Sequence, residues 1–169
     1  VIGKVYAHGR KTVFGQGNSA HVCLLQPRSR GTVSLASRDP MALPLVDPQF
    51  LADPQDMQRM VRGFQRIREI LAQPALAQFG AREVAASTQA RTEAQIEQFI
   101  RQYADTIYHP VGSCRMGPGP LDVVDSQLRV HGLEGLRVVD ASIMPRIVSG
   151  NTNAPTVMIA EKAVDLLRA

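Results

Sequence analysis

The chain has 169 residues, of which 44% are hydrophobic and 20% are charged. This globular composition fits about one domain and excludes a collagen, a coiled coil and a disordered tail. No stretch stays apolar over the roughly 18 residues that a transmembrane segment needs, and no signal sequence opens the chain. Because the sequence begins at Val1 and not at a methionine, we expect a processed or excised chain.

The formal charge of +4 does not predict a nucleic-acid partner. It comes from 19 basic and 15 acidic residues, and the arginines are scattered along the chain without a block of like charge. Only 5% of the residues are aromatic, so few rings are available to stack on bases. Cys23 and Cys114 lack the C-x-x-C spacing of metal sites, and we expect two free thiols and no bound metal.

The first third of the chain predicts short antiparallel strands. Three β-branched or apolar runs cover residues 11–14, 21–25 and 32–35. Turn-forming residues separate them at 15–18 and 27–31. The pattern predicts an antiparallel meander.

Residues 15–20 also match the G-x-G-x-x-G/A pattern of dinucleotide-binding loops. That loop functions only where a helix starts at the second glycine, because the free N–H groups of the helix bind the pyrophosphate. Here the following residues 22–25 are strand-like, and Pro27 interrupts the chain soon after. We therefore interpret the match as a hairpin turn.

Two amphipathic helices are predicted next. Asp53 is a candidate N-cap with Pro54 in the first turn, and apolar residues then recur every three or four positions over residues 57–71. Residues 92–95 form a capping box that starts the second helix. Residues 73–91 between them predict a loop or a broken helix.

The remainder alternates loops with short regular elements. Residues 108–120 are rich in Gly and Pro, and loops of this kind often carry function. Residues 127–130 and 136–139 are strand-like, and a final helix is predicted from Asn153 to Leu167. One side of that helix carries Val157, Val164 and Leu167.

His109 is the histidine with the most suggestive surroundings. It follows the second helix, Pro110 restricts its backbone, and Gly112 and Gly117 would let a ligand approach the main chain. The other three histidines have no acidic or hydroxyl residue at a spacing that would suggest a catalytic pair. They are expected to be structural or exposed: His8, His21 and His131. A single histidine is more often a packing residue than a catalytic one, so this loop alone leaves both interpretations open.

Residues 108–117 and 138–156 together closely resemble the C-terminal part of the glucose–methanol–choline (GMC) family of FAD-dependent alcohol oxidoreductases. The bacterial choline- and alcohol-dehydrogenase branch is the most similar. The resemblance extends from about residue 20 to the end and includes residues 25–33 and 47–51.

The resemblance implies an α+β fold in which helices flank an antiparallel β-sheet, as in the GMC substrate-binding domain. Residues 1–135 would be part of that domain. Residues 136–169 would form a strand–loop–helix segment that completes the FAD-binding domain, with the C-terminal helix packed on it.

The resemblance also assigns roles to residues. His109 matches the histidine beside the flavin, and Asn151 matches its partner, which is histidine or asparagine in the family. Cofactor contacts are implied for Asp140, Ala141, Asn151, Thr152 and Asn153. On sequence alone, Asn151 and Asn153 could equally be helix caps.

The implied chemistry is consistent with these residue types. Oxidation of an alcohol removes a hydride from carbon and a proton from the hydroxyl, and imidazole can accept that proton near neutral pH. A positioned base contributes about 10² to 10⁴ in rate. An asparagine amide that donates to the reacting oxygen contributes about 3 to 4 kcal/mol.

We therefore expect part of an enzyme that oxidises a primary or secondary alcohol to an aldehyde or ketone. The electron acceptor would be a quinone, another carrier or oxygen. A pyrophosphate-binding glycine loop is missing, so most of the FAD would be bound by an N-terminal part, and this chain alone is expected to be inactive. A non-catalytic binding domain and a lyase on the same scaffold are the alternatives. A cytoplasmic location in a bacterium is expected, with peripheral association to the inner membrane left open.

Overall fold

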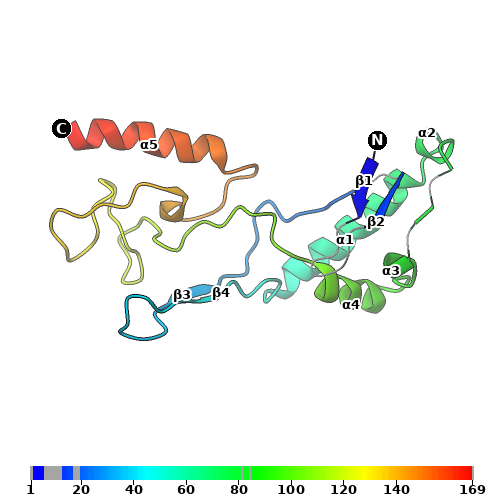
Figure 1. Cartoon of the computed structure of the whole chain (residues 1–169), viewed down its shortest axis with the longest axis horizontal. Helices are drawn as coiled ribbons and strands as arrows, with labels where there is room; N and C mark the ends of the chain where they lie inside the picture. Colours follow the sequence, from blue (N-terminus) through cyan, green and yellow to red (C-terminus); the bar gives the residue numbers. More distant parts are fainter. Residues whose placement is uncertain (1, 6–12, 17–19, 81, 84, 169) are drawn as a thin grey trace. The chain divides into compact units, whose positions relative to one another are not determined.

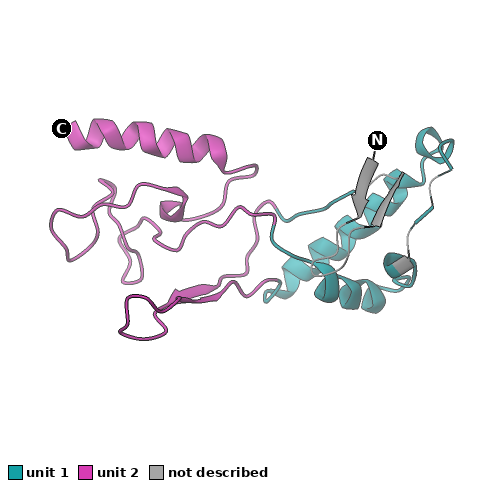
Figure 2. Cartoon of the chain, in the orientation of Figure 1, with its two compact units in different colours: residues 1–24, 51–106 teal, residues 25–50, 107–169 magenta. Residues whose placement is uncertain are grey.

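The computed structural model describes residues 2–5, 13–16, 20–80, 82–83 and 85–168. They belong to two compact units (Figure 2). Unit 1 comprises residues 1–24 and 51–106, and unit 2 comprises residues 25–50 and 107–169. Each unit is therefore assembled from two segments that are distant in the sequence.

In unit 1, strands β1 (Ile2–Val5) and β2 (Val13–Gln16) form an antiparallel pair in which Ile2 lies opposite Gln16. The described part of the strand predicted over residues 11–14 is confirmed. The turn predicted at residues 15–18 begins too early, because Gly15 and Gln16 still belong to β2. Positions 11, 12, 17 and 18 lie outside the described residues.

The strand predicted over residues 21–25 is wrong, because this described segment is irregular. A strand needs a partner for its backbone groups. The segment instead places the side chain of Val22 against helix α1 at Gly63, where an added Cβ would lie 2.5 Å from Val Cγ2. No helix begins in residues 20–25 either, so residues 15–20 are not followed by the helix that a dinucleotide-binding loop requires.

The two predicted helices of unit 1 are confirmed (Figure 1). Helix α1 (Pro54–Leu71) starts where Asp53 accepts a hydrogen bond from the Gln55 N–H at 2.8 Å. Helix α4 (Glu93–Tyr103) starts with the predicted capping box. The single-turn helices α2 (Pro74–Ala77) and α3 (Ala85–Thr88) interrupt the segment expected to be a loop or a broken helix.

The core of unit 1 is formed where α1 and α4 pack side by side. Buried residues from both helices and the preceding turn make it up: Met57, Val61, Ala90, Ile96 and Ile100. The rings of Phe64 and Phe99 extend it, with centroids 5.3 Å apart. Arg68 lies over Phe64 and donates to the carbonyls of Ser87 and Ala90, which anchors the connection to α4.

Unit 2 begins with a separate hairpin. Strand β3 (Thr32–Ser34) pairs antiparallel with β4 (Leu45–Asp47), with Val33 opposite Val46. Gly31 is required at its base, because an added Cβ would lie 2.2 Å from the Asp47 carbonyl oxygen. The strand predicted at 32–35 is thus confirmed through Ser34. The meander is wrong, since β3 pairs with β4 and not with residues 21–25.

The strands predicted at residues 127–130 and 136–139 are also wrong. They contribute only isolated bridges, Val124 to Val130 and Arg129 to Arg137. Leu128 has a φ of 64°, a left-handed conformation that interrupts an extended run.

Unit 2 ends in the 3₁₀ helix η1 (Ala141–Ile143) and helix α5 (Asn153–Arg168), which confirms the predicted C-terminal helix. Its core combines loop residues with one side of α5: Val124, Leu128, Ile143, Met144, Ile159 and Ala163. The predicted apolar side of α5 is not the buried one, since Val157, Val164 and Leu167 are 53%, 40% and 63% exposed.

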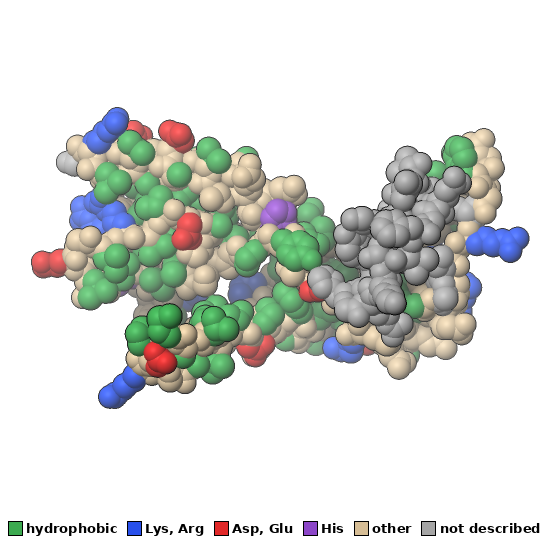
Figure 3. Space-filling view, in the orientation of Figure 1, with side chains coloured by type: hydrophobic (Ala, Val, Ile, Leu, Met, Phe, Trp, Pro, Cys, Tyr) green, Lys and Arg blue, Asp and Glu red, His purple; other side chains and the backbone are tan. Residues whose placement is uncertain are grey.

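The two antiparallel hairpins and the helices make this an α+β fold, as the sequence predicted. Within the described residues, no helix is both long and apolar enough to cross a membrane. On the face drawn in Figure 3, basic and acidic side chains are scattered and apolar ones are visible between them.

Candidate functional site

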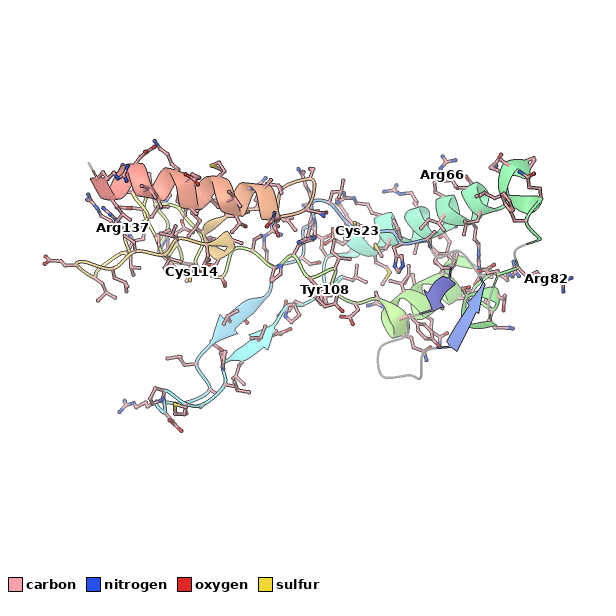
Figure 4. All side chains as sticks on the ribbon, turned by 45° about the horizontal axis from the view of Figure 1, so that its top comes forward. Cys23, Arg66, Arg82, Tyr108, Cys114 and Arg137 are labelled. Carbon is pink, nitrogen blue, oxygen red and sulfur yellow. The ribbon has the colours of Figure 1, made fainter. Side chains whose placement is uncertain are left out.

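His109 lies in the loop that enters unit 2 after helix α4. Tyr108 just before it has a φ of 65°, and Tyr108 and Cys114, both labelled in Figure 4, bracket the loop. The imidazole is half-buried, and its Nδ1 lies 2.9 Å from Oγ1 of Thr152. This hydrogen bond joins the two segments that the sequence singled out, across 43 positions.

Backbone hydrogen bonds hold the His109 loop against η1. The Cys114 N–H donates to the Ser142 carbonyl at 3.1 Å, and the Met116 N–H donates to the Ile143 carbonyl at 2.8 Å. Gly112 has a φ of 87°, and an added Cβ would lie 3.3 Å from the Met144 carbonyl oxygen. A glycine is therefore needed where this loop bends onto η1.

At the start of η1, an Asp140 carboxylate oxygen accepts a hydrogen bond from the Ser142 N–H at 2.7 Å. Asp140 is exposed, and Ala141 is half-buried. Ser142 Oγ is buried and has no hydrogen-bond partner among the described residues. Since buried hydroxyls are usually paired, this one is available to a bound polar group.

Hydrogen bonds from Thr156 to the Thr152 carbonyl hold the start of α5. The Thr152 carbonyl accepts from the Thr156 N–H at 3.0 Å and from the Thr156 hydroxyl at 2.6 Å. The first N–H groups of a helix have no intrahelical partner, and Asn153 and Ala154 supply them here at an exposed position. Such a helix start favours a negative charge beside it.

The loop before α5 has a further restraint. Gln26 Nε2 donates to Ser149 Oγ at 2.8 Å, which ties this loop to the first segment of unit 2. Asn151 and Asn153 are exposed on either side of the buried Thr152. Two asparagines therefore flank, in the sequence, the threonine whose hydroxyl contacts His109.

A second cluster stiffens the loop after His109. Arg115 Nε donates to one Asp122 oxygen, and the Gly119 N–H donates to the other at 2.7 Å. These two hydrogen bonds, led by that of Arg115, lower the pKa of Asp122. His131 Nε2 lies 2.9 Å from the Gly117 carbonyl oxygen, so this histidine has a structural contact, as predicted.

The carboxylate of Asp125 is held in a similar way. Hydrogen bonds from the backbone N–H groups of Arg129 and Gln127, at 2.9 and 2.8 Å, lower its pKa, with that of Arg129 the larger cause. Asp125 therefore fixes the turn that follows the bridge at Val124.

The other histidines and the two cysteines are also candidate functional residues by their chemistry. His21 is exposed, and His8 lies outside the described residues. Cys23 and Cys114 are free thiols, as expected. Within the described ranges, no group of three or more His, Cys, Asp or Glu could hold a metal ion.

The structure thus places His109 within hydrogen-bond distance of Thr152, which lies between Asn151 and Asn153 in the sequence. Backbone hydrogen bonds also join η1 to the His109 loop. The catalytic and cofactor-binding roles given to these residues stay predictions. Sequence reasoning missed the contact of Thr152 with His109 and the unpaired hydroxyl of Ser142. No local spacing signals either one, because both depend on loops that meet only in the folded chain.

The chain is similar to known proteins in both sequence and structure. A family profile described as GMC oxidoreductase, C-terminal, matches residues 27–160. The chain is 49% identical over 160 residues to an alcohol dehydrogenase (acceptor) of Pseudomonas putida. It is 44% identical over 161 residues to an oxygen-dependent choline dehydrogenase of Chromohalobacter salexigens. Each alignment covers 95% of this chain but only 29% of the relative.

Among solved structures, the chain is similar to an FAD-dependent oxidoreductase from Chaetomium thermophilum. The TM-score is 0.76 at 32% sequence identity, and the match covers 85% of this chain and 25% of the other. The similarity in fold therefore extends over most of the chain and over a quarter of that oxidoreductase.

Proposed function

Because the chain belongs to the GMC oxidoreductase family, we propose that it is the C-terminal part of an FAD-dependent enzyme that oxidises an alcohol to an aldehyde or ketone. The observation that carries the proposal is the hydrogen bond between His109 and Thr152. It brings an imidazole to the start of a helix that is flanked by two exposed asparagines.

The described residues fit a bound flavin nucleotide. Ser142 Oγ offers a buried hydrogen-bonding group without a partner in the chain, and the start of α5 offers free N–H groups. Asp140, Ala141, Asn151, Thr152 and Asn153 would hold the cofactor. When bound, FAD would supply the acceptor for the hydride that leaves the carbinol carbon.

His109 is proposed as the general base. As the C–H bond of the alcohol breaks, its hydroxyl proton must also leave, and the imidazole would accept it. The half-buried position of His109 suits this role, because the ring can meet a small substrate while part of it stays shielded from water.

Asn151 is proposed to donate its amide N–H to the substrate oxygen. Negative charge develops on that oxygen while the proton is lost, and a preorganised donor stabilises the charge. The exposed side chain of Asn151 stands at the end of the loop that Gln26 and Ser149 restrain. The N-terminal end of α5 would further favour negative charge beside it.

We propose that this chain is part of a longer protein, since it covers only 29% of each of these relatives, and that the remainder supplies the other components. We propose that residues 136–169 complete an FAD-binding domain, with the exposed Val157, Val164 and Leu167 of α5 packed against it. Residues 1–135 would be part of the substrate-binding domain. Electrons would pass on to a quinone, another carrier or oxygen, and the protein would be cytoplasmic or peripheral to the inner membrane.

The chain alone is proposed to bind FAD too weakly for turnover, because the expected pyrophosphate-binding loop is not in it. Purification of residues 1–169 with added FAD tests this. A colourless protein after gel filtration is the expected result. A yellow protein with a stable flavin spectrum would contradict it.

The deciding experiment substitutes His109→Ala in the full-length protein that contains this chain. Flavin reduction by a panel of simple alcohols, followed anaerobically, is expected to slow by about 10² to 10⁴ while FAD stays bound. His131→Ala is the matched control, since His131 contacts the Gly117 carbonyl outside the proposed site. Unchanged reduction in His109→Ala would rule out the base, and failure of every alcohol to reduce the flavin would favour a lyase or a binding domain.

A further inference from the structure

Thr152 contacts the proposed base directly and does so through a buried hydroxyl. Its Oγ1 lies 2.9 Å from His109 Nδ1, and the residue is only 9% exposed. A buried hydrogen bond meets little competition from water, so this contact can restrain the imidazole.

Hydrogen bonds within the first turn of α5 hold Thr152 in place. The Thr152 carbonyl accepts two hydrogen bonds from Thr156, at 3.0 Å from the N–H and 2.6 Å from the hydroxyl. These bonds fix the backbone of Thr152 to the first turn of α5. Threonine is branched at Cβ, which limits its χ1 to few rotamers. Helix α5 therefore sets the place of Oγ1.

The contact involves Nδ1, so the direction of this hydrogen bond determines which ring nitrogen can accept a proton. If Oγ1 accepts a hydrogen bond from Nδ1–H, the lone pair of the neutral ring is on Nε2, which can act as a base. If the hydroxyl donates to Nδ1 instead, Nε2 carries the hydrogen and cannot accept a proton. Only the first arrangement is compatible with a base that works through Nε2.

We infer that Thr152 is a positioning residue for His109: its hydroxyl accepts the Nδ1 hydrogen and thereby presents the Nε2 lone pair to the substrate. This inference rests on the proposed function and adds a role beyond contact with the cofactor. In this proposal Thr152 does not itself act on the reacting carbon or on the hydroxyl proton. It acts through the orientation and the tautomer of the imidazole.

The test compares Thr152→Val with Thr152→Ser in the full-length enzyme. Valine keeps the branched shape and removes the hydroxyl, whereas serine keeps the hydroxyl and removes the methyl group. We expect Thr152→Val to lower the limiting rate of flavin reduction about 10- to 100-fold, as for other outer hydrogen bonds that orient a functional imidazole. The rate is expressed per bound FAD, because Thr152 is also proposed to contact the cofactor. Melting temperature and KM should stay close to those of the unsubstituted enzyme, and Thr152→Ser should restore most of the rate.

Thr92→Val is the matched control, because it removes the threonine hydroxyl that accepts from the Gln95 N–H at the start of α4 in unit 1. Its rate should stay near that of the unsubstituted enzyme. A normal rate in Thr152→Val, or an equally slow Thr152→Ser, would overturn the inference. If His109→Ala does not slow flavin reduction, the proposed function itself fails. If only His109→Ala slows it, the base stands and Thr152 is not its positioning residue.

A direct measurement needs no substitution at Thr152. Nitrogen NMR of histidine-labelled enzyme reports the tautomer of each ring, and the His109→Ala variant identifies the signal of His109. The neutral ring is expected to carry its hydrogen on Nδ1. A hydrogen on Nε2 would overturn the inference even if Thr152→Val fails to fold.

Discussion

Unit 1 and unit 2 are stabilised in different ways. In unit 1, regular helices bury apolar side chains between α1 and α4, with Ile96 only 1% exposed. In unit 2, loops are joined by backbone hydrogen bonds such as Cys114 to Ser142, and one helix contributes Ile159 and Ala163 to the core. The candidate site lies within unit 2. The comparison indicates that helical packing stabilises unit 1, whereas paired loops hold the candidate site residues of unit 2.

The largest effect is expected from core truncation in either unit. Ile96→Ala and Ile159→Ala should each lower the free energy of unfolding by about 2 to 5 kcal/mol, because each leaves a cavity. Hydrogen exchange should rise in α1 and α4 for Ile96→Ala. For Ile159→Ala it should rise in α5 and in the bridged segment around Val124.

The matched variants Ile96→Val and Ile159→Val remove one methylene group each, and about 0.5 to 1.5 kcal/mol is expected from each. Urea denaturation measures all four free energies. If Ile159→Ala costs no more than Ile159→Val, the small core of unit 2 does not contribute as proposed, and its loops depend on hydrogen bonds alone.

A smaller effect is expected at the capping box of α4. Thr92→Ala removes the hydroxyl that accepts from the Gln95 N–H at 3.3 Å and should cost about 1 kcal/mol. Thr92→Ser, which keeps the hydroxyl, should be close to the unsubstituted protein. Exchange of the Gln95 amide measures the change, and equal exchange in both variants would show that the cap is unimportant here.

The smallest effect is a pH dependence confined to the loop after His109. The pKa of Asp122 is lowered in the folded protein from its ordinary value of 3.8, first by Arg115 and then by the Gly119 N–H. Its stabilising contribution is thus present above pH 3.8 and lost as the pH falls through the lower folded pKa. Exchange in residues 115–124 should rise on acidification below that value.

The control for this acid effect is Asp122→Asn, in which the contribution of Asp122 to the pH dependence should be absent. Asp125, whose pKa is also lowered, keeps its own titration in this variant. An identical acid response in Asp122→Asn and the unsubstituted protein would show that the Arg115 pair does not hold this loop.

The helices were predictable because their signals are local. Asp53 with Pro54 marked the start of α1, the capping box marked α4, and Pro155 lies in the first turn of α5. Strands were harder, because pairing is decided by distant residues. Residues 21–25 have a strand-like composition, yet Val22 packs on Gly63. Leu128 interrupts a run that composition alone predicts to be extended.

The candidate site could be predicted only in part. The resemblance to GMC enzymes supplied His109 and Asn151 from two motifs, and their roles remain to be tested. The hydrogen bond of His109 to Thr152 could not be derived from residue spacing, because it depends on how the loop at Gly112 bends onto η1. Long-range backbone pairing leaves no periodic trace in a single sequence.

The hydrogen bond between Gln26 and Ser149 has a consequence for the order of folding. It joins residues 123 positions apart, so a large loop-closure entropy must be lost before the bond can contribute any stability. Helices such as α1 and α4 form through contacts close in the sequence, so their formation loses much less loop-closure entropy. The loop that carries Asn151 is therefore expected to reach its final conformation late, after most of the chain has been synthesised and the local elements of both units exist.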